Sequence, residues 1–282
     1  MNKKNEKVKE VYDKLVKGVE GFRNTDEYIK FLKFAKNFHN YSFSNKVLIF
    51  SQFEDATQVM GYKKWQSVGR YVKPESKGIQ IFCPMMLKRK VKVKDENENE
   101  TEEEQSYLRF RPGYVYDISQ TEGQEVPKLP SVLDSNTKEN LLEKLITFSP
   151  LPVNYKKLSK NHYGYYDVKN KYIVLNETMS IDDKVSTLLH ELTHALYDDF
   201  NYQENKNLSE VFVESVSFIV ADYFDLDTSL CSFKYVNDYA NNDAKVVIDL
   251  GTKIQETAKT FIEKLEFEFS KKLEVAVWTN RI

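Results

Sequence analysis

The sequence predicts an α+β fold, and two kinds of pattern indicate it. Apolar residues recur at helical spacing over the first 35 residues and again over 182–199 and 206–224, which predicts helices. Segments 78–87 and 172–176 hold apolar and β-branched residues between turn-forming residues, which predicts strands. Helices and strands thus alternate irregularly along the chain, as in a protein that mixes both in separate layers.

The chain is expected to form two domains. The segment GQEVPKLPSVLDSN is polar and holds two prolines, which is typical of a linker. We therefore place a linker at 126–136, between a first domain over 1–125 and a second over 137–282.

The remaining elements follow from the same signals, taken in chain order. Residues 88–106 pass from a basic block into an acidic one with almost no apolar residues, so we expect a mobile hairpin tip there. The other expected elements are a third helix over KVLIFSQF, a helix at 62–68, a strand-like stretch over 107–118, a helix at 137–148, a hairpin within 161–177 and a last pair of helices in 243–271.

Composition bounds the class of protein. A chain that is 41% hydrophobic and 13% aromatic can fill cores of ordinary size. No apolar run approaches the roughly 18 residues of a membrane span, and the start, MNKKNEKVKEVYDKL, lacks the apolar segment of a secretory signal. We expect a cytoplasmic protein without membrane contact.

The charge is divided unevenly along the chain. Residues 1–94 hold 21 Lys+Arg against 9 Asp+Glu, a net +12, so the remainder carries −14. A basic part suits a polyanion through sequence-independent phosphate contacts, although a solvated basic face without a partner is the alternative. Aromatic and basic residues interleave between 38 and 82, and single strands bind such a mixture because bases stack on rings while cations follow phosphates. The candidate DNA contacts are Tyr41, Asn45, Lys63, Lys64, Trp65, Arg70, Tyr71, Lys73 and Lys77.

The stretch LLHELTHALYD carries the pattern His190-Glu191-x-x-His194, in which two imidazoles one helical turn apart can share one metal ion. A chance match on an ordinary helix is the alternative. At 100° per residue, a stripe of apolar residues falls on one face of this helix and both histidines fall opposite, so the histidines are not core residues. The stripe comprises Val185, Leu188, Leu189, Leu192, Ala195 and Leu196. The ligand type predicts one Zn²⁺ ion.

A third ligand is needed, and the helix SEVFVESVSFIVADYF offers Glu210 and Glu214 on one face. Two carboxylates four residues apart on an otherwise apolar helix are costly to bury unless they bind or pair with something. Either can be the ligand, and the other would then accept a hydrogen bond from an imidazole N–H. Glu191 would lie beside the ion as the general base, although a surface salt bridge is its alternative role.

The chain also resembles a known family. The order NYSFSN, ATQVMGYKKWQSVGRYVKPESKGIQIFCPM and GYVYDISQTEG resembles the N-terminal domain of ArdC-like antirestriction proteins of plasmids and mobile genetic elements. That resemblance implies single-stranded DNA binding by the first domain and a zincin-like metallopeptidase fold, with HExxH, in the second. Glu214-Ser-Val-Ser-Phe218 is similar to a family phrase whose glutamate binds the metal, which favours Glu214 as the third ligand and leaves Glu210 as its partner or substitute.

Three functions remain open on these grounds. The first is an antirestriction-type protein that binds single-stranded DNA and carries a zinc metallopeptidase for an unidentified protein substrate. The second is a single-stranded-DNA-binding protective protein whose metal site is structural or inactive. A third, in which the metal acts on phosphodiesters, would favour an oxygen-rich two-metal site over this set of ligands.

Overall fold

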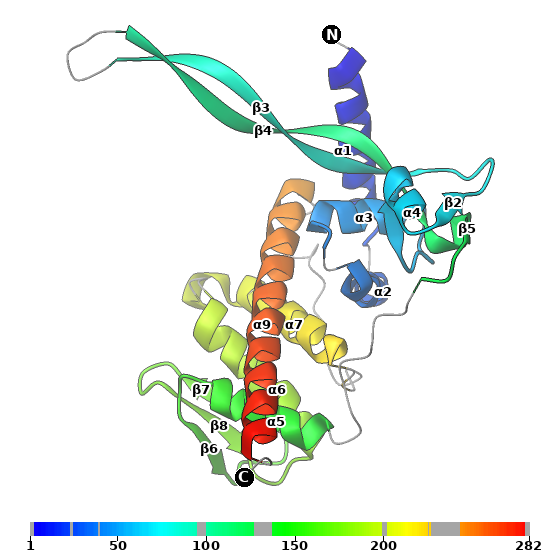
Figure 1. The fold of residues 1–282 in the computed structure, drawn as a ribbon. Helices are drawn as coiled ribbons and strands as arrows, with labels where there is room; N and C mark the ends of the chain where they lie inside the picture. The colour runs from blue at the N-terminus through cyan, green and yellow to red at the C-terminus, as the bar shows by residue number, and fades with distance from the viewer. Residues whose placement is uncertain are drawn as a thin grey trace. The chain divides into compact units, whose positions relative to one another are not determined.

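Mixed helices and strands confirm the predicted α+β class in the computed structural model (Figure 1). The structure describes residues 3–22, 25–38, 40–94, 100–126, 137–198, 202–224, 226 and 243–279. Contacts divide the chain into two compact units. The first comprises Met1–Gly21 and Ser44–Val126, and the second comprises Phe22–Phe43 and Pro127–Ile282.

The first unit is built on a three-stranded antiparallel sheet of order β1-β4-β3. Its strands are β1 (Val59–Gly61), β3 (Ile79–Lys94) and β4 (Glu100–Asp117), and β2 (Arg70–Val72) pairs with β5 (Thr121–Gly123) in a second, smaller sheet. The helices are α1 (Lys3–Glu20), α3 (Phe43–Gln52) and α4 (Tyr62–Ser67), and a 3-10 turn, η2, covers Ile118–Gln120.

A buried contact ties α3 to β3 in this unit. The side-chain amide of Asn45 donates to the carbonyl of Phe82 at 2.9 Å and accepts from the Phe82 N–H at 2.9 Å. The amide thus pairs with the strand as a neighbouring strand would, which satisfies backbone groups that the helix would otherwise leave buried without partners.

Strands β3 and β4 form one long two-stranded ribbon, paired from Ile79↔Val115 to Lys94↔Glu100. The expected mobile tip over 88–106 is therefore wrong for 88–94 and 100–106, while 95–99 lie outside the described residues. Opposite charges across the strands account for the difference. Lys88 Nζ lies 2.8 Å from Glu104 Oε2, and Lys90 Nζ lies 2.9 Å from Glu102 Oε2. Such cross-strand pairs each stabilise strand pairing by about 0.2–1 kcal/mol, without any core.

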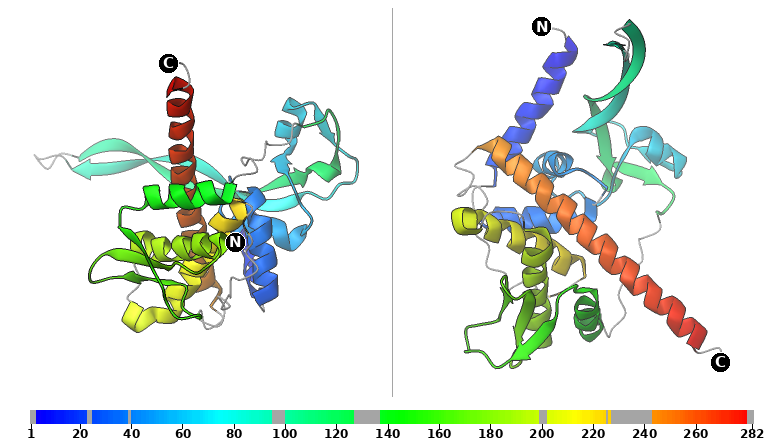
Figure 2. Two further views of the ribbon diagram at one scale, coloured as in Figure 1. Left: turned by 90° about the horizontal axis from the view of Figure 1, so that it is seen from below. Right: turned by 90° about the vertical axis from the view of Figure 1, so that its left-hand side faces the viewer.

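The second unit sets helices against a three-stranded sheet of order β6-β8-β7 (Figure 2). Strand β8 is central, parallel to β6 and antiparallel to β7, and its residues Ile173, Val174 and Leu175 are fully buried. The strands are β6 (Val153–Lys156), β7 (Gly164–Asp167) and β8 (Tyr172–Asn176), and the helices are α2 (Thr25–Ala35), α5 (Thr137–Phe148), α6 (Ile181–Tyr197), α7 (Tyr202–Tyr223) and α9 (Ala244–Thr279). None of the helices that the structure describes is both long and apolar enough to cross a membrane.

The segment Phe22–Phe43 packs with the second unit, whereas the sequence-based division assigned it to a domain over 1–125. The Phe31 ring lies 4.7 Å from the ring of Phe22, and the Tyr28 hydroxyl lies 3.2 Å from Ser215 Oγ on α7. Lys36 Nζ also forms an ion pair with Asp222 at 3.2 Å. Helical periodicity predicts that α2 has an apolar face, but it does not tell which core covers that face.

Helix α9 is a single helix, so the expected pair of helices over 243–271 is wrong. Gly251 lies inside this helix, where glycine costs stability relative to alanine. The reason for glycine is a close approach. A Cβ atom at Gly251 would overlap the ring of Phe43, so the missing side chain makes room for that ring against the helix backbone.

Gly251→Ala should therefore lower the free energy of unfolding by about 1–3 kcal/mol, because the new methyl group overpacks the contact with Phe43. In an open helix the same substitution raises stability by up to about 1 kcal/mol, so the sign of the change is diagnostic. Denaturant unfolding followed by circular dichroism measures it. The exposed Glu256→Ala on the same helix is the control, and the pair Phe43→Leu with Gly251→Ala should recover part of the loss.

Candidate metal centre

Helix α6 presents the two histidines away from the core. Its N-terminus is capped by Ser180, whose side chain accepts a hydrogen bond from the Asp183 N–H. Of the predicted apolar stripe, Val185, Leu188, Leu189 and Leu192 are fully buried, whereas Ala195 and Leu196 are half-buried. Burial of this stripe fixes the rotation of the helix, and His190 and His194 consequently face α7 with 27% and 13% of their side chains exposed.

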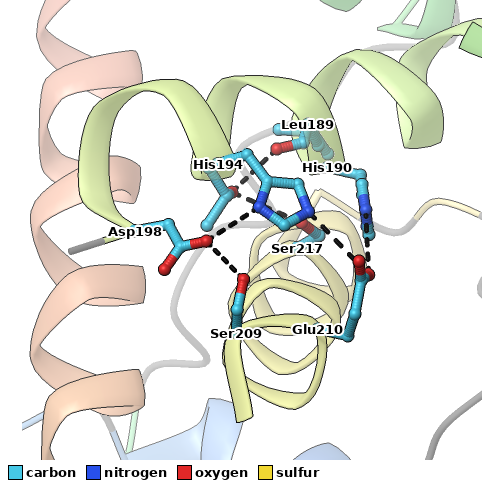
Figure 3. A network of polar contacts seen from close by, with 8 residues as sticks. Leu189, His190, His194, Asp198, Ser209, Glu210 and Ser217 are labelled. Carbon is cyan, nitrogen blue, oxygen red and sulfur yellow. Dashed lines mark hydrogen bonds and ion pairs between the residues drawn. The ribbon is translucent and has the colours of Figure 1, made fainter. Parts of the chain in front are cut away.

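Glu210 on α7 meets both imidazoles (Figure 3). Its Oε2 atom lies 3.6 Å from His190 Nε2 and 3.8 Å from His194 Nε2, and one ligand atom from each residue lies within 4.8 Å of the others. Tetrahedral zinc with bonds of about 2.0–2.2 Å separates two ligand atoms by roughly 3.4 Å. These three side chains therefore fit a metal ion with small adjustments, and they are the one such group of three or more among the described residues.

Glu214, the third ligand that the sequence resemblance favours, is not in this group, and its assignment as a ligand stays a prediction. Glu214 lies one turn further along α7 and lines a hollow that His190 and Glu191 also line. Both glutamates share one face of α7, and the point at which α7 crosses α6 decides which of them meets the histidines. That crossing point is not readable from spacing, and Glu210 is the carboxylate beside the imidazoles.

Asp198, rather than the second glutamate, orients an imidazole. His194 Nδ1 lies 2.9 Å from Asp198 Oδ2, and the hydroxyl of Ser209 donates to the same oxygen (Figure 3). A proton on Nδ1 donated to Asp198 leaves the lone pair of Nε2 directed towards Glu210, which is the tautomer that a metal ion requires. The sequence analysis missed Asp198, although its spacing of four residues from His194 on one helix was a usable signal.

Glu191 lies in a buried environment that favours its protonated form. Burial raises the pKa of Glu191 to about 7, and the negative charge of Glu210 acts in the same direction. The charge of His194 and a hydrogen bond from the backbone N–H of Tyr166 lower it, but they do not outweigh burial. A carboxyl group with this pKa can both accept and release a proton near neutral pH.

The two histidines differ in protonation. Burial, helped by the charge of His194, lowers the pKa of His190 to about 4, so its imidazole is neutral and ready to bind a metal. Burial favours the neutral form of His194, but hydrogen bonds with Asp198 and Glu210 outweigh that effect. The net result is that the pKa of His194 is raised to about 9. Metal binding at His194 would therefore release a proton.

Two hollows flank His190 and Glu191. One, of about 490 Å³, is lined by Tyr165, Tyr166 and Lys171, and the other, of about 520 Å³, by Asn161, His162 and Asp183. Strand β7 lies at the edge of the sheet beside them, and β8 is central. The Tyr166 N–H that reaches Glu191 belongs to this edge strand.

Three of the expected DNA contacts in the first unit have structural roles instead. Trp65 is fully buried, and its Nε1–H donates to the carbonyl of Tyr116 at 2.8 Å. Asn45 is buried against β3, as described above. The guanidinium group of Arg70 donates to Thr121 and to the carbonyl of Gln124 at 2.6 Å, which leaves it poorly placed to bind a phosphate.

The other expected contacts remain accessible. Tyr41 is half-buried, and the remaining side chains, Lys63, Lys64, Tyr71, Lys73 and Lys77, are exposed. Sequence reasoning did not commit to Tyr62 and Tyr114, which are 50% and 57% exposed. For Tyr114, the sequence signal was the alternation of inward and outward side chains along a strand, because its neighbour Val115 is apolar and buried.

Comparison with known proteins agrees with this architecture. The model of the N-terminal domain of anti-restriction factor ArdC matches residues 4–116, and that of the IrrE N-terminal-like domain (Peptidase_M78) matches residues 145–224. An uncharacterized protein of Bacillus anthracis is 25% identical over 313 residues, which cover 94% of this chain and 52% of the relative. The chain thus spans about half the length of that relative.

One solved structure shares the fold. The metal-free crystal structure of the antirestriction ArdC protein from the R388 plasmid has a TM-score of 0.51 at 16% identity, covering 82% of this chain and 86% of that one. Its Mn(II)-bound structure has a TM-score of 0.49 at 16% identity, covering 81% and 88%. This chain therefore matches an ArdC N-terminal domain followed by an IrrE N-terminal-like domain of the M78 peptidase type, and it shares the fold of the R388 ArdC protein.

Proposed function

We propose that this protein is an antirestriction-type protein of a mobile genetic element, which binds single-stranded DNA and cleaves a protein substrate with one zinc ion. The observation that carries the peptidase half is the meeting of His190, His194 and Glu210 beside Glu191, whose pKa burial raises to about 7. A metal ligand set next to a proton-exchanging carboxyl group suits hydrolysis.

His190 and His194 would hold the ion through imidazole nitrogens, and Glu210 through a carboxylate oxygen. Two nitrogens and one oxygen from protein match the donor set of catalytic zinc sites, in which a fourth position stays open. When bound, the ion would supply a Lewis acid that lowers the pKa of water and polarises the scissile carbonyl group.

The side chains around the ligands have separable tasks in this proposal. Glu191 would take a proton from the attacking water on its carboxylate and pass it to the departing amine, and the Tyr166 N–H holds that carboxylate in position. Asp198 fixes the tautomer of His194. The outer edge of β7 would pair with an extended peptide, whose side chains would enter the two hollows.

Exposed tyrosines and lysines of the first unit support single-stranded DNA binding. Tyr62, Tyr71 and Tyr114 are each at least half exposed, and Tyr62 packs edge-on against Tyr116 at 6.4 Å between ring centroids. Bases can stack on such rings while neighbouring lysines contact phosphates. The proposed contacts are Tyr62, Lys63, Lys64, Tyr71, Lys73, Lys77 and Tyr114.

The metal assignment predicts different outcomes for the two glutamates of α7. His190→Ala and Glu210→Ala should each reduce bound zinc from one ion per chain to a small fraction, because two ligands hold the ion poorly. Glu214→Ala, matched in charge and helix, should keep the ion. Elemental analysis after dialysis measures this, with manganese determined in the same samples. Full zinc in Glu210→Ala with its loss in Glu214→Ala would reverse the assignment.

The catalytic role predicts that Glu191→Gln retains the metal but loses at least about 100-fold in the rate of peptide cleavage, as expected for a general base. Cleavage of unfolded casein by the zinc-loaded chain, followed by mass spectrometry, provides the measurement, and the exposed Glu177→Gln is the control. Transfer of unmodified plasmid DNA into a restricting host tests the alternative. Full protection by Glu191→Gln would favour the binding-only protein with an inactive metal site.

The single-strand site predicts that Lys63→Ala with Lys64→Ala weakens oligonucleotide binding and lowers the slope of log affinity against log salt by about 1.4, or about 0.7 for each lost phosphate contact. Fluorescence anisotropy at several salt concentrations gives both quantities. Lys7→Ala with Lys9→Ala removes the same charge from exposed positions of α1 in the same unit. Equal losses in the two double variants would indicate only a general effect of charge.

A further inference from the structure

The β3–β4 ribbon has two unlike faces. Side chains alternate between the faces of a strand, and directly paired residues share a face. The lysine face therefore carries Pro84, Met86, Lys88, Lys90, Glu102, Glu104, Leu108 and Phe110, and the arginine face carries Cys83, Met85, Leu87, Arg89, Gln105, Tyr107, Arg109 and Arg111. In Figure 1 the ribbon extends beyond the helices of the first unit.

Among the ribbon side chains that the structure describes, ion pairs lie on the lysine face only. Lys88 and Lys90 pair there with Glu104 and Glu102 at 2.8 and 2.9 Å. On the arginine face, the guanidinium group of Arg89 donates instead to the neutral amide of Gln105 at 3.0 Å. Arg109 and Arg111 are exposed as well, and no carboxylate among the described side chains forms an ion pair with an arginine of this face. By register Glu103, paired with Val91, lies on this face too, so three arginines and one glutamate give the arginine face a net charge of +2.

The arginine face also holds two of its cations in fixed positions. The Cζ atoms of Arg89 and Arg109 lie over the ring of Tyr107, at 5.5 and 5.7 Å from its centroid. The register places Arg109 one step towards the base of the ribbon from Tyr107, and Arg89 one step towards its tip. Cation–π contacts thus order both guanidinium groups before any ligand binds.

These cation–π contacts make the arginine face better suited to double-stranded than to single-stranded DNA. A single strand is bound by stacking its bases on free aromatic faces, as the exposed Tyr62 and Tyr114 allow. The Tyr107 ring is engaged by two guanidinium groups, so it is a poor platform for a base. Arginines do suit phosphates and guanine edges, to which they donate paired hydrogen bonds.

We infer that the arginine face of the β3–β4 ribbon binds double-stranded DNA, at a site separate from the proposed single-strand site. A major groove about 12 Å wide admits a two-stranded β-ribbon. Ordered arginines on a face with a net positive charge match the phosphates and guanines that line such a groove. The chain would then bind duplex and single-stranded DNA through different side chains, so it could bind both at a point where a duplex opens into a single strand.

Two double variants of the full chain test this inference. Arg109→Gln with Arg111→Gln removes two charges from the arginine face, and Lys88→Gln with Lys90→Gln removes two from the lysine face of the same ribbon. Anisotropy with a labelled 20-base-pair duplex should show about tenfold weaker binding for the arginine variant, with a salt slope lower by about two. Its affinity for a 20-nucleotide single strand, and the duplex affinity of the lysine variant, should stay within twofold.

Three results would overturn the inference, with circular dichroism establishing that both variants are folded. They are an unchanged duplex affinity in the arginine variant, equal losses in both variants, and a loss confined to the single strand. The variant Lys63→Ala with Lys64→Ala reports on the single-strand site independently. If the proposed single-strand site is wrong, that variant keeps its single-strand affinity, and the duplex comparison between the two ribbon variants remains interpretable.

Discussion

The packing of α6 against α7 is the constraint on which the metal centre depends. Burial of Leu188, Leu189 and Leu192 fixes the rotation of α6, and a turn of one residue, about 100°, would carry both histidines away from α7. Transferring three leucine side chains out of water stabilises the unit by several kcal/mol, which far exceeds what the polar groups can contribute against it. The ligand geometry is therefore imposed by the core, and Glu210 lies 21% exposed at the rim, where its carboxylate meets two imidazoles and keeps some contact with water.

The parts of the site that lie within one helix could be predicted from the sequence, and those that join two helices could not. The pair His190 and His194 and the opposite apolar stripe follow from helical periodicity alone. Which carboxylate lies beside both imidazoles depends on where the two helices cross, and side-chain packing decides that crossing point, so the spacing of Glu210 and Glu214 alone cannot choose between them. Asp198 could be predicted only in part. Its spacing of four residues from His194 is visible in the sequence, but its contact with the His194 imidazole also requires that α6 ends at this residue.

The first unit shows why composition alone misplaces individual side chains. Trp65 and Tyr62 belong to the same short helix, and both lie in a run of aromatic and basic residues. Trp65 is fully buried, because a small sheet needs a large ring to fill its core and the carbonyl of Tyr116 satisfies the indole N–H. Tyr62 is left half exposed at the start of that helix. A residue type enriched at nucleic-acid surfaces is thus equally suited to a core, and only the packing of α4 separates the two roles.

The β3–β4 ribbon brings the basic and acidic segments of the sequence together, so the uneven charge along the chain does not persist in the folded first unit. A division at residue 94 gives a strongly basic first part, but β4 returns the acidic block to the lysines of β3, and the whole first unit holds 19 Lys+Arg against 17 Asp+Glu, a net +2. A net field of that size cannot attract a polyanion over long distances. Affinity for DNA must then come from local groups whose charge is not cancelled, within a Debye length of about 8 Å at physiological salt. The exposed lysines around α4 and the arginine face of the ribbon have that property, whereas the lysine face has lost it to its own glutamates.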